Sequence, residues 1–306
     1  MEGGCIWSER DYSCAYDSVF MTLFAIYRHA STNWCKQWKT GSDFGSFLAA
    51  QFDHLLSSFH IDVAGQCTLF TSYRDSFRDF LSSKDPVRFK RTGRVFAAAS
   101  DILNFISNAD YFPHGIKTTF TCLNEDCVSL TTMHPVVDLC SPGVWWKVSS
   151  DPTPPQTPLQ CFVDAYVQII SYPPNHCCPT CSQPYALPPS TTIDAMWLWF
   201  EIFHSYGRII LPSPSLIFTC NGTPLQYDLV AIIYGDGLHF TARWCNPTGT
   251  WWSYDGRQLA GCPQIDNPND LNDLGGRAAH ILLYCLTPFA SGVTYLTLSS
   301  LSYLYS

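Results

Sequence analysis

Long apolar runs and runs of basic residues are both missing from this sequence. No stretch of about 18 or more apolar residues occurs, so we expect no membrane-spanning helix and no membrane partner. Lys and Arg number 17 against 25 Asp and Glu, a net charge of −8, which argues against nucleic acid as a partner. Only 14% of the 306 residues are charged and 46% are hydrophobic, a composition typical of a globular protein.

The first 13 residues lack the apolar stretch of a secretory signal and carry charges at Glu2, Glu9 and Arg10. We therefore expect a cytoplasmic or nuclear protein. Its 15 cysteines are then expected to be reduced thiols, because disulfide frameworks belong to oxidising compartments. Reduced thiols serve as core filler, metal ligands or nucleophiles.

Apolar residues at three- and four-residue steps predict two helices in the first third, one from Cys14 and one from Ser42 or Asp43. Two shorter helices are expected over 72–83 and 95–108. From about Lys117 the chain is rich in Thr, Val, Trp and Pro. Strands are expected there over 117–132, 144–149, 159–172, 226–244, 249–254 and 278–286. A helical front, a β-rich back and a Cys- and Pro-rich insertion over 173–189 predict an α+β fold.

Cys14 stands where a polar loop gives way to the first predicted helix. We expect Ser13 to be the N-cap, which places Cys14 in the first helical turn. There the helix dipole and the free backbone amides favour a thiolate and can hold an oxyanion. The structural alternative is a small buried thiol, since a neutral thiol needs a base to become a nucleophile.

Residues 237–256 predict a β-hairpin whose side chains alternate around His239. We expect a five-residue loop over 245–249, which pairs Trp244 with Thr250. In that register His239 faces Asp255 on the same side of the sheet. A carboxylate there would fix the imidazole tautomer and stabilise its charged form. The alternatives are a hydrogen-bonded strand histidine and an ordinary Asp-Gly turn.

Two cysteine pairs have the spacing of structural zinc ligands. Cys122 and Cys127 are separated by four residues, and Cys178 and Cys181 by two. Together they predict one four-thiolate Zn²⁺ site that would hold the insertion in place. The alternative is a set of unrelated thiols. Substitute ligands at one position are Cys140, His176 and Cys177.

In their order, these elements resemble the ubiquitin-specific protease superfamily of papain-like cysteine isopeptidases. Residues 13–20 (SCAYDSVF) resemble its cysteine box, and residues 238–242 (LHFTA) with 252–255 (WSYD) resemble its histidine box. Residues 278–284 (AAHILLY) resemble the strand that closes that box. Cys5-Ile-Trp7 before Cys14, and His239-Phe240 in place of the usual His-Tyr, resemble the divergent branch that acts as a SUMO isopeptidase.

The resemblance implies a single catalytic domain over 1–306. It divides into a helical thumb (1–115), zinc-binding fingers (117–190) and an antiparallel β palm (191–306). It also implies a monomeric thiol protease that cleaves ubiquitin or a ubiquitin-like modifier, SUMO included, after its C-terminal glycine. Cys14 would be the nucleophile, His239 the base and Asp255 the residue that orients the base. Trp7, Tyr12, Trp244 and Trp252 are candidates for lining the cleft that takes the modifier's tail.

The cysteine box departs from the family pattern. The family places an Asn oxyanion donor five residues before the Cys, where this chain has Glu9, and an ionised carboxylate cannot donate a hydrogen bond. Backbone amides or Ser13 would then replace the donor, or activity is low. Three alternatives follow: an inactive modifier-binding module of the same fold, a zinc-ribbon interaction protein, and a transglutaminase-like acyltransferase.

Overall fold

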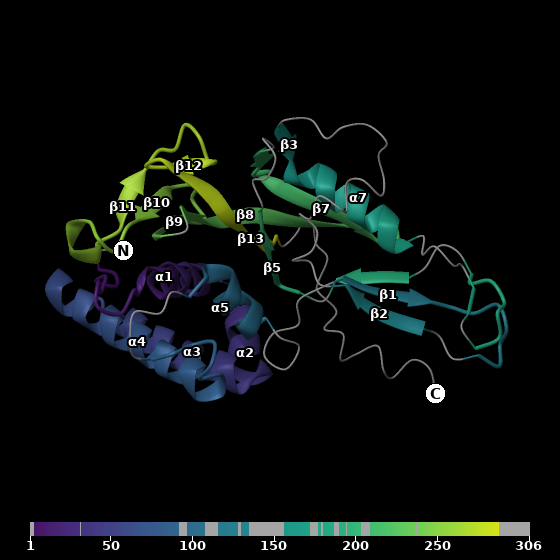
Figure 1. Cartoon of the computed structure of the whole chain (residues 1–306), viewed down its shortest axis with the longest axis horizontal. Coiled ribbons are helices and arrows are strands. Elements are labelled where there is room, and N and C mark those ends of the chain that lie inside the picture. Colours follow the sequence, from purple (N-terminus) through teal and green to yellow (C-terminus); the bar gives the residue numbers. More distant parts are fainter. Residues whose placement is uncertain are drawn as a thin grey trace.

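The computed structural model divides into a helical layer, a large antiparallel sheet and an extended three-stranded sheet (Figure 1). It describes residues 3–287 except for residues 31, 92–96, 108–115, 128–129, 135–155, 172–176, 179, 187–189, 194, 203–208 and 237. No helix in this described part is long and apolar enough to cross a bilayer. The predicted α+β fold class is confirmed.

The helical layer is formed by the first third of the chain. Its helices are α1 (Cys14–His29), α2 (Thr32–Gly41), α3 (Asp43–Ser57), α4 (Val63–Lys84) and α5 (Ala99–Ile106). Side chains cap two of them, since Ser42 accepts the backbone N–H of Gly45 at 2.9 Å and Asp62 accepts that of Gly65 at 2.7 Å. The helix expected over 72–83 is the second half of the longer α4.

Helix α1 lies at the centre of the molecule, with every residue from Cys14 to Tyr27 buried. It packs against α3, α4 and α5 on one side and against two strands of the large sheet on the other. Phe20 is fully buried, and its ring centroid lies 5.3 Å from that of Phe52 and 5.9 Å from that of Phe77. The apolar side chains that recur at helical spacing in the sequence thus fix the helix that begins at Cys14 in the core.

The large sheet has the strand order β11-β10-β9-β8-β13-β12, with β5 paired to β13 and β7 to β8, all antiparallel. Its strands are β5 (Trp197–Glu201), β7 (Ser215–Cys220), β8 (Thr223–Gly235), β9 (Phe240–Cys245), β10 (Trp251–Tyr254), β11 (Gln264–Asp266), β12 (Asp273–Leu274) and β13 (Arg277–Leu286). Along β13, Ile281 and Leu283 join the core shared with α1, whereas Leu282 and Tyr284 join a second core on the opposite face. The middle of the sheet is therefore buried on both faces.

The second core is covered by helix α7 (Leu159–Ser171), where the sequence predicted a strand over 159–172. That prediction is wrong. Leu159, Phe162, Val163 and Tyr166 are buried at the three- and four-residue steps of a helix, and this stripe packs over the sheet beside β7 (Figure 1). Strand β3 (Gln156–Pro158), directly before α7 in the chain, forms a short parallel pair with β6 (Ile209–Leu211).

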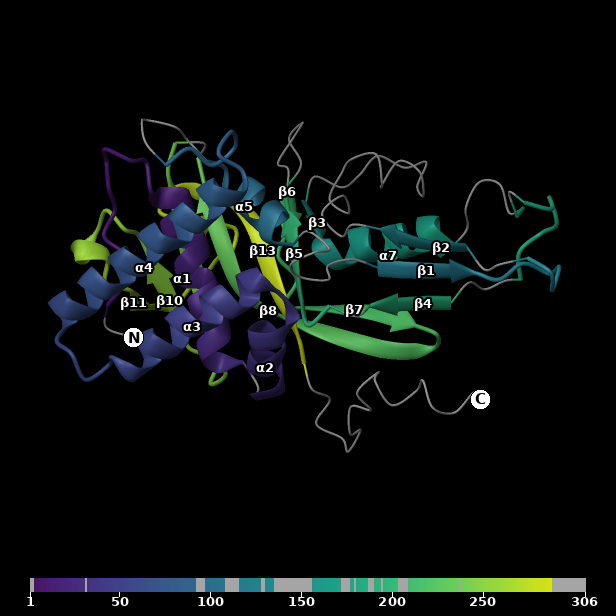
Figure 2. The ribbon, with the colours of Figure 1, turned by 90° about the horizontal axis from the view of Figure 1, so that it is seen from below.

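A narrow three-stranded sheet extends away from the helical layer (Figure 2). It has the order β2-β1-β4, with β1 (Ile116–Phe120) between β2 (Leu130–His134) and β4 (Ser190–Ile193). Beyond the strands, the backbone N–H of Ala186 donates to the carbonyl of Thr121 at 2.8 Å and joins the two segments that carry the cysteine pairs.

Candidate active site

The β9–β10 hairpin positions His239 and Asp255. Trp251 pairs with Cys245 and Trp252 with Trp244, so the loop between the strands has the predicted five residues but covers 246–250 in place of 245–249. The register differs from the predicted one by two residues, which leaves every side chain on the predicted face.

The contact expected between His239 and Asp255 is present. Nε2 of His239 lies 2.8 Å from Oδ1 of Asp255, and His239 is only 1% exposed. Asp255 also accepts the backbone N–H of Arg257 at 3.0 Å and the side-chain amide of Gln258 at 3.3 Å. Burial acts to raise the pKa of Asp255, but the hydrogen bonds from His239 and Arg257 outweigh it and leave this pKa below its usual range. The carboxylate is thus ionised at neutral pH.

The other ring nitrogen of His239, Nδ1, has different surroundings. Nδ1 is buried and has no hydrogen-bond partner among the residues that the structure describes. When Nε2–H donates to Asp255, Nδ1 carries a free lone pair inside the protein. Asp236 holds this segment in place, because its carboxylate accepts the backbone N–H groups of Leu238 and His239 at 2.9 and 2.8 Å.

Cys14 is the first residue of α1 and is 4% exposed. Helix α1, which begins at Cys14, packs against β9, and β9 begins directly after His239. Burial raises the pKa of the Cys14 thiol, and the backbone N–H groups of Phe240 and Ala15 offset part of this rise in pKa. The helix start therefore does not produce the thiolate that we expected, and a base is needed to take the proton.

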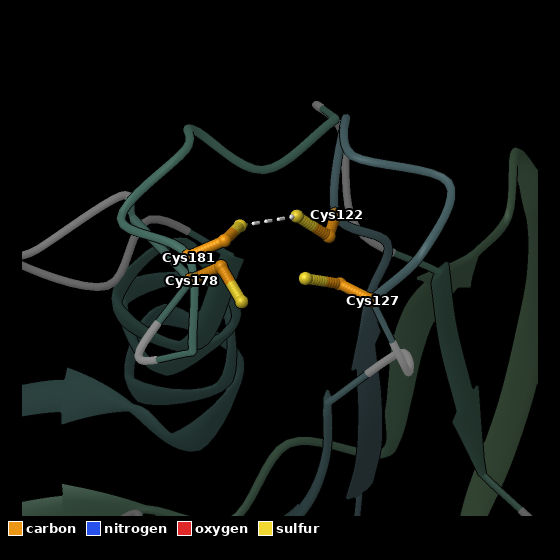
Figure 3. A group of neighbouring side chains, drawn as sticks. All are labelled: Cys122, Cys127, Cys178 and Cys181. Atoms are coloured by element: carbon orange, nitrogen blue, oxygen red, sulfur yellow. Dashed lines mark hydrogen bonds between the residues drawn. The ribbon is translucent and has the colours of Figure 1, made fainter.

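The four predicted zinc ligands converge at the end of the narrow sheet (Figure 3). The sulfurs of Cys122, Cys127, Cys178 and Cys181 all lie within 4.8 Å of one another, and those of Cys122 and Cys181 are 3.4 Å apart. Four thiolates around a tetrahedral ion would be spaced by about 3.8 Å, so the donor set fits Zn²⁺. Of the substitute ligands, Cys177 is exposed and outside this group, and Cys140 and His176 lie outside the described residues.

Backbone N–H groups support the cluster as they do in metal–thiolate sites. Asn124 donates to the sulfur of Cys122 and Thr180 to that of Cys178, both at 3.4 Å. N–H groups of Cys181 and Thr180 lower the pKa of Cys178 to about 6, whereas the bond with Cys181 raises that of Cys127 to about 12. Thiols this close cannot all ionise unless a cation binds among them. The spacing of the four sulfurs fits such a cation, so the cluster can hold a metal.

Two solved structures resemble this chain over nearly its whole length. Both contain the SAGA DUB module of Ubp8, Sgf11, Sus1 and Sgf73, one bound to monoubiquitin and the other to ubiquitin aldehyde. Each match has a TM-score of 0.53 at 14% identity and covers 94% of this chain, and the matches cover 69% and 70% of the chains found. This chain thus shares its mixed helix and antiparallel-sheet fold with these SAGA DUB module structures. No family model and no curated protein match the sequence, so the likeness is one of fold.

The loop before Cys14 is held by a buried network that the sequence did not indicate. The hydroxyl of Ser13 accepts the backbone N–H of Ser8 at 2.8 Å and donates to Asp17 at 2.8 Å. Asp17 also forms a buried ion pair with Arg74 of α4. Ser13 is the N-cap residue of α1, as predicted, but its side chain makes no cap hydrogen bond, and its only proton is donated to Asp17. Burial raises the pKa of Asp17 to about 6 against the effects of Arg74 and Ser13.

Trp7, in the loop before Cys14, contacts the segments that carry His239 and Asp255. Its backbone N–H donates to the carbonyl of Gly256 at 3.2 Å, directly after Asp255. Its ring lies edge-on to that of His239 with centroids 6.3 Å apart, and the guanidinium of Arg257 stacks 4.2 Å from its centre. We expected Trp7 near the site, but no sequence signal indicated Arg257.

Proposed function

We propose that this protein is a thiol-dependent isopeptidase that cleaves ubiquitin or a ubiquitin-like modifier from its conjugates after the C-terminal glycine. The observation that carries the proposal is the state of His239. One ring nitrogen is held by Asp255, and the other is buried, free among the described residues, and directly before β9, the strand against which the helix of Cys14 packs. This arrangement suits a base that takes a proton from a thiol.

In the proposed reaction, Nδ1 of His239 takes the Cys14 proton as the sulfur attacks the carbonyl carbon of the modifier's last glycine. The imidazolium then gives this proton to the leaving lysine amine, while Asp255 stabilises the charged ring. Water, deprotonated by His239, attacks the thioester and releases the modifier, and the proton returns to the sulfur. The first-turn amides of α1 are proposed as oxyanion donors, because Glu9 is exposed and Ser13 already donates to Asp17.

We further propose that the four-cysteine cluster holds a structural Zn²⁺. The chain would contribute Cys122, Cys127, Cys178 and Cys181, and the ion would supply a crosslink between the two segments rather than any step of catalysis. We also propose that the protein acts as a monomer in the cytoplasm or nucleus, where zinc-binding thiols stay reduced.

Ubiquitin and SUMO that carry a C-terminal propargyl group test this function and the choice of modifier together. We expect the intact chain to gain the mass of one modifier, with the new bond on Cys14. Cys14→Ala should abolish the adduct, whereas Cys245→Ala, a partly buried thiol at the far end of β9, should leave it unchanged. An adduct that survives in Cys14→Ala would contradict the proposal.

The second candidate is an inactive module of the same fold that binds a modifier without cleaving it. Glu9 favours it, because the expected oxyanion donor is missing. If the folded chain binds ubiquitin or SUMO in a calorimetric titration but forms no adduct with either probe, this second function replaces the first.

A further inference from the structure

Two cysteines outside the candidate active site and the metal cluster lie in contact. Sγ of Cys67 on α4 is 3.7 Å from Sγ of Cys262, although the residues are 195 positions apart in the chain. Cys67 is 3% exposed, and Cys262 is partly exposed, so a small reagent can reach the pair from the Cys262 side. Within the described residues, the four-cysteine cluster is the only group of three or more close metal ligands, and neither Cys67 nor Cys262 belongs to it.

The backbone around the pair is closely packed, which holds the two sulfurs together. The N-terminal segment 3–6 lies between α4 and the segment 254–262. A Cβ on Gly3 would come within 2.6 Å of the side chain of Gln66, and one on Gly4 within 2.3 Å of the carbonyl of Gly261. Ile6 donates its backbone N–H to Thr71 of α4 at 3.0 Å.

On the other side of this segment, Tyr254 donates its hydroxyl proton to the carbonyl of Cys5 at 2.7 Å. Cys67 and Cys262 therefore lie on the two elements that pack against opposite sides of the N-terminal segment.

The turn that presents Cys262 is strained. Leu259 and Ala260 have φ values of 47° and 53°, which residues other than glycine rarely adopt. Gly261 follows with a φ of 79°. Such conformations persist only where the surroundings impose them. Here the close approach of Gly261 to Cys5 does so, because a Cβ on Gly261 would lie 2.2 Å from the Cys5 carbonyl oxygen. The position of Cys262 is thus set by tertiary packing.

We propose that Cys67 and Cys262 form a reversible disulfide when the protein meets a disulfide oxidant such as oxidised glutathione. The sulfurs need to approach from 3.7 Å to the bond length of about 2.05 Å. The Cys262 thiolate attacks glutathione disulfide, which breaks its S–S bond and releases one glutathione. Cys67 then attacks the Cys262 sulfur of the mixed disulfide and releases the second glutathione. The two cysteines lose two electrons, and their two protons end on the two reduced glutathiones.

The chemistry of Cys262 sets the rate of this reaction. Burial, and then the contact with Cys67, raise the pKa of Cys262 to about 11. The reactive thiolate is therefore scarce at neutral pH. As long as the pH stays below that pKa, raising the pH by one unit increases the thiolate fraction about tenfold. We expect slow crosslinking at pH 7 and clearly faster crosslinking at pH 8.5.

The crosslink would join α4 to the segment that follows Asp255. Arg74, which pairs with Asp17, lies two helical turns after Cys67, and Asp255 lies seven residues before Cys262. The bond would close a loop of 195 residues and restrict the unfolded chain, so the oxidised protein should be harder to unfold.

Peptide mapping tests the proposal without any measurement of activity. Under non-reducing conditions trypsin leaves Cys67 in the peptide 40–74 and Cys262 in the peptide 258–277, each with one cysteine. After treatment of the metal-loaded chain with oxidised glutathione, we expect these two peptides to become crosslinked and the melting temperature to rise by about 5 °C or more. Dithiothreitol should reverse both changes.

Cys262→Ala, at the partly exposed position, should abolish the crosslink and the rise in melting temperature, and Cys35→Ala should retain both. If either variant fails to fold, peptide mapping of the native chain still decides. Glutathione that stays on Cys262, a crosslink between other cysteines, or thiols that remain free after prolonged oxidation at pH 8.5 would each overturn the proposal.

Discussion

At the scale of single residues, Trp7 has the surroundings of a positioning residue for the His239–Asp255 pair. Its indole contacts both the Arg257 guanidinium and, nearly at right angles, the His239 ring, so it shields part of the imidazole from water. A hydrogen bond such as that between His239 and Asp255 is stronger where water is excluded. Trp7 should therefore affect the chemistry of the histidine without touching the substrate's reacting atoms.

Trp7→Ala should lower kcat on the order of tenfold to a hundredfold, because a small displacement of the base is costly. It should leave KM nearly unchanged and shift the acid limb of the pH–rate profile, which steady-state kinetics against pH would reveal. Trp7→Phe should restore part of the rate, and Thr248→Ala, in the exposed hairpin loop, should have no effect. An unchanged pH profile with a reduced rate would indicate a purely structural role for Trp7.

Asp17 affects the nucleophile through its charge. After the dominant effect of burial, the carboxylate of Asp17 is among the groups that raise the pKa of Cys14. Asp17→Asn removes this charge, so the pKa of Cys14 should fall and its thiolate fraction at pH 7 should rise. We expect faster alkylation of Cys14 by iodoacetamide at pH 7, measured by mass spectrometry over a pH series.

The same substitution should cost stability. It leaves the buried Arg74 without its main partner, which should lower the free energy of unfolding by about 3 kcal/mol or more. Asp79→Asn, whose carboxylate pairs with Arg91 at the surface, should change neither property. Equal alkylation rates in Asp17→Asn and the parent chain would show that Asp17 has no electrostatic effect on Cys14.

At the scale of elements, the outer end of the narrow sheet depends on its cysteine cluster. The core there consists of Phe120, Tyr185 and the cysteines themselves, whereas Ile116 and Ile193 at the other end of the sheet join the core under α7. Helix α1 is packed in a third core, shared by the helices and the large sheet. A cluster this small cannot offset the conformational entropy of the segments that it joins. The metal is therefore expected to stabilise this element locally.

Cys178→Ser should reduce the bound zinc, measured by atomic emission, from one ion per chain to well below one. Hydrogen exchange should become faster in β1, β2 and β4 but stay slow in α1, because the two cores are separate. Cys177→Ser, one residue away and exposed, is the matched control and should keep both properties. Full zinc occupancy in Cys178→Ser would exclude this ligand set.

At the scale of the whole molecule, α1 connects the two layers and carries Cys14 at its start. Phe20 occupies the middle of this helix and is surrounded by the aromatic rings of α3 and α4. Interior packing leaves little freedom to close a gap. The stability of the fold and the position of the nucleophile therefore depend on the same contacts.

Phe20→Ala should lower the free energy of unfolding by about 3–5 kcal/mol in urea denaturation, because it leaves a cavity in the shared core. Val87→Ala, at a side chain that is 82% exposed, should change it by less than about 0.5 kcal/mol. A small effect of Phe20→Ala would mean that the helical layer rearranges to fill the cavity.

The sequence by itself determined the features that depend on local spacing. The apolar period of α1 and α3, the facing of His239 and Asp255, and the convergence of the two cysteine pairs all follow from side-chain periods and ligand spacing. The error of two residues in the hairpin register did no harm, because strand side chains alternate with a period of two. Over residues 159–172 the side-chain period was unclear and the strand prediction was wrong. The segment is a helix whose apolar side chains pack on the sheet.

Only the tertiary structure decided which groups are free and which are already bound. The Ser13 hydroxyl donates to Asp17, the Nδ1 of His239 has no partner among the described residues, and Cys67 touches Cys262 across 195 positions. Local patterns contain no information on such contacts, because they depend on how distant elements pack and on which polar groups that packing buries. The state of the thiol at Cys14 has the same origin, since burial rather than its place in the helix dominates its pKa.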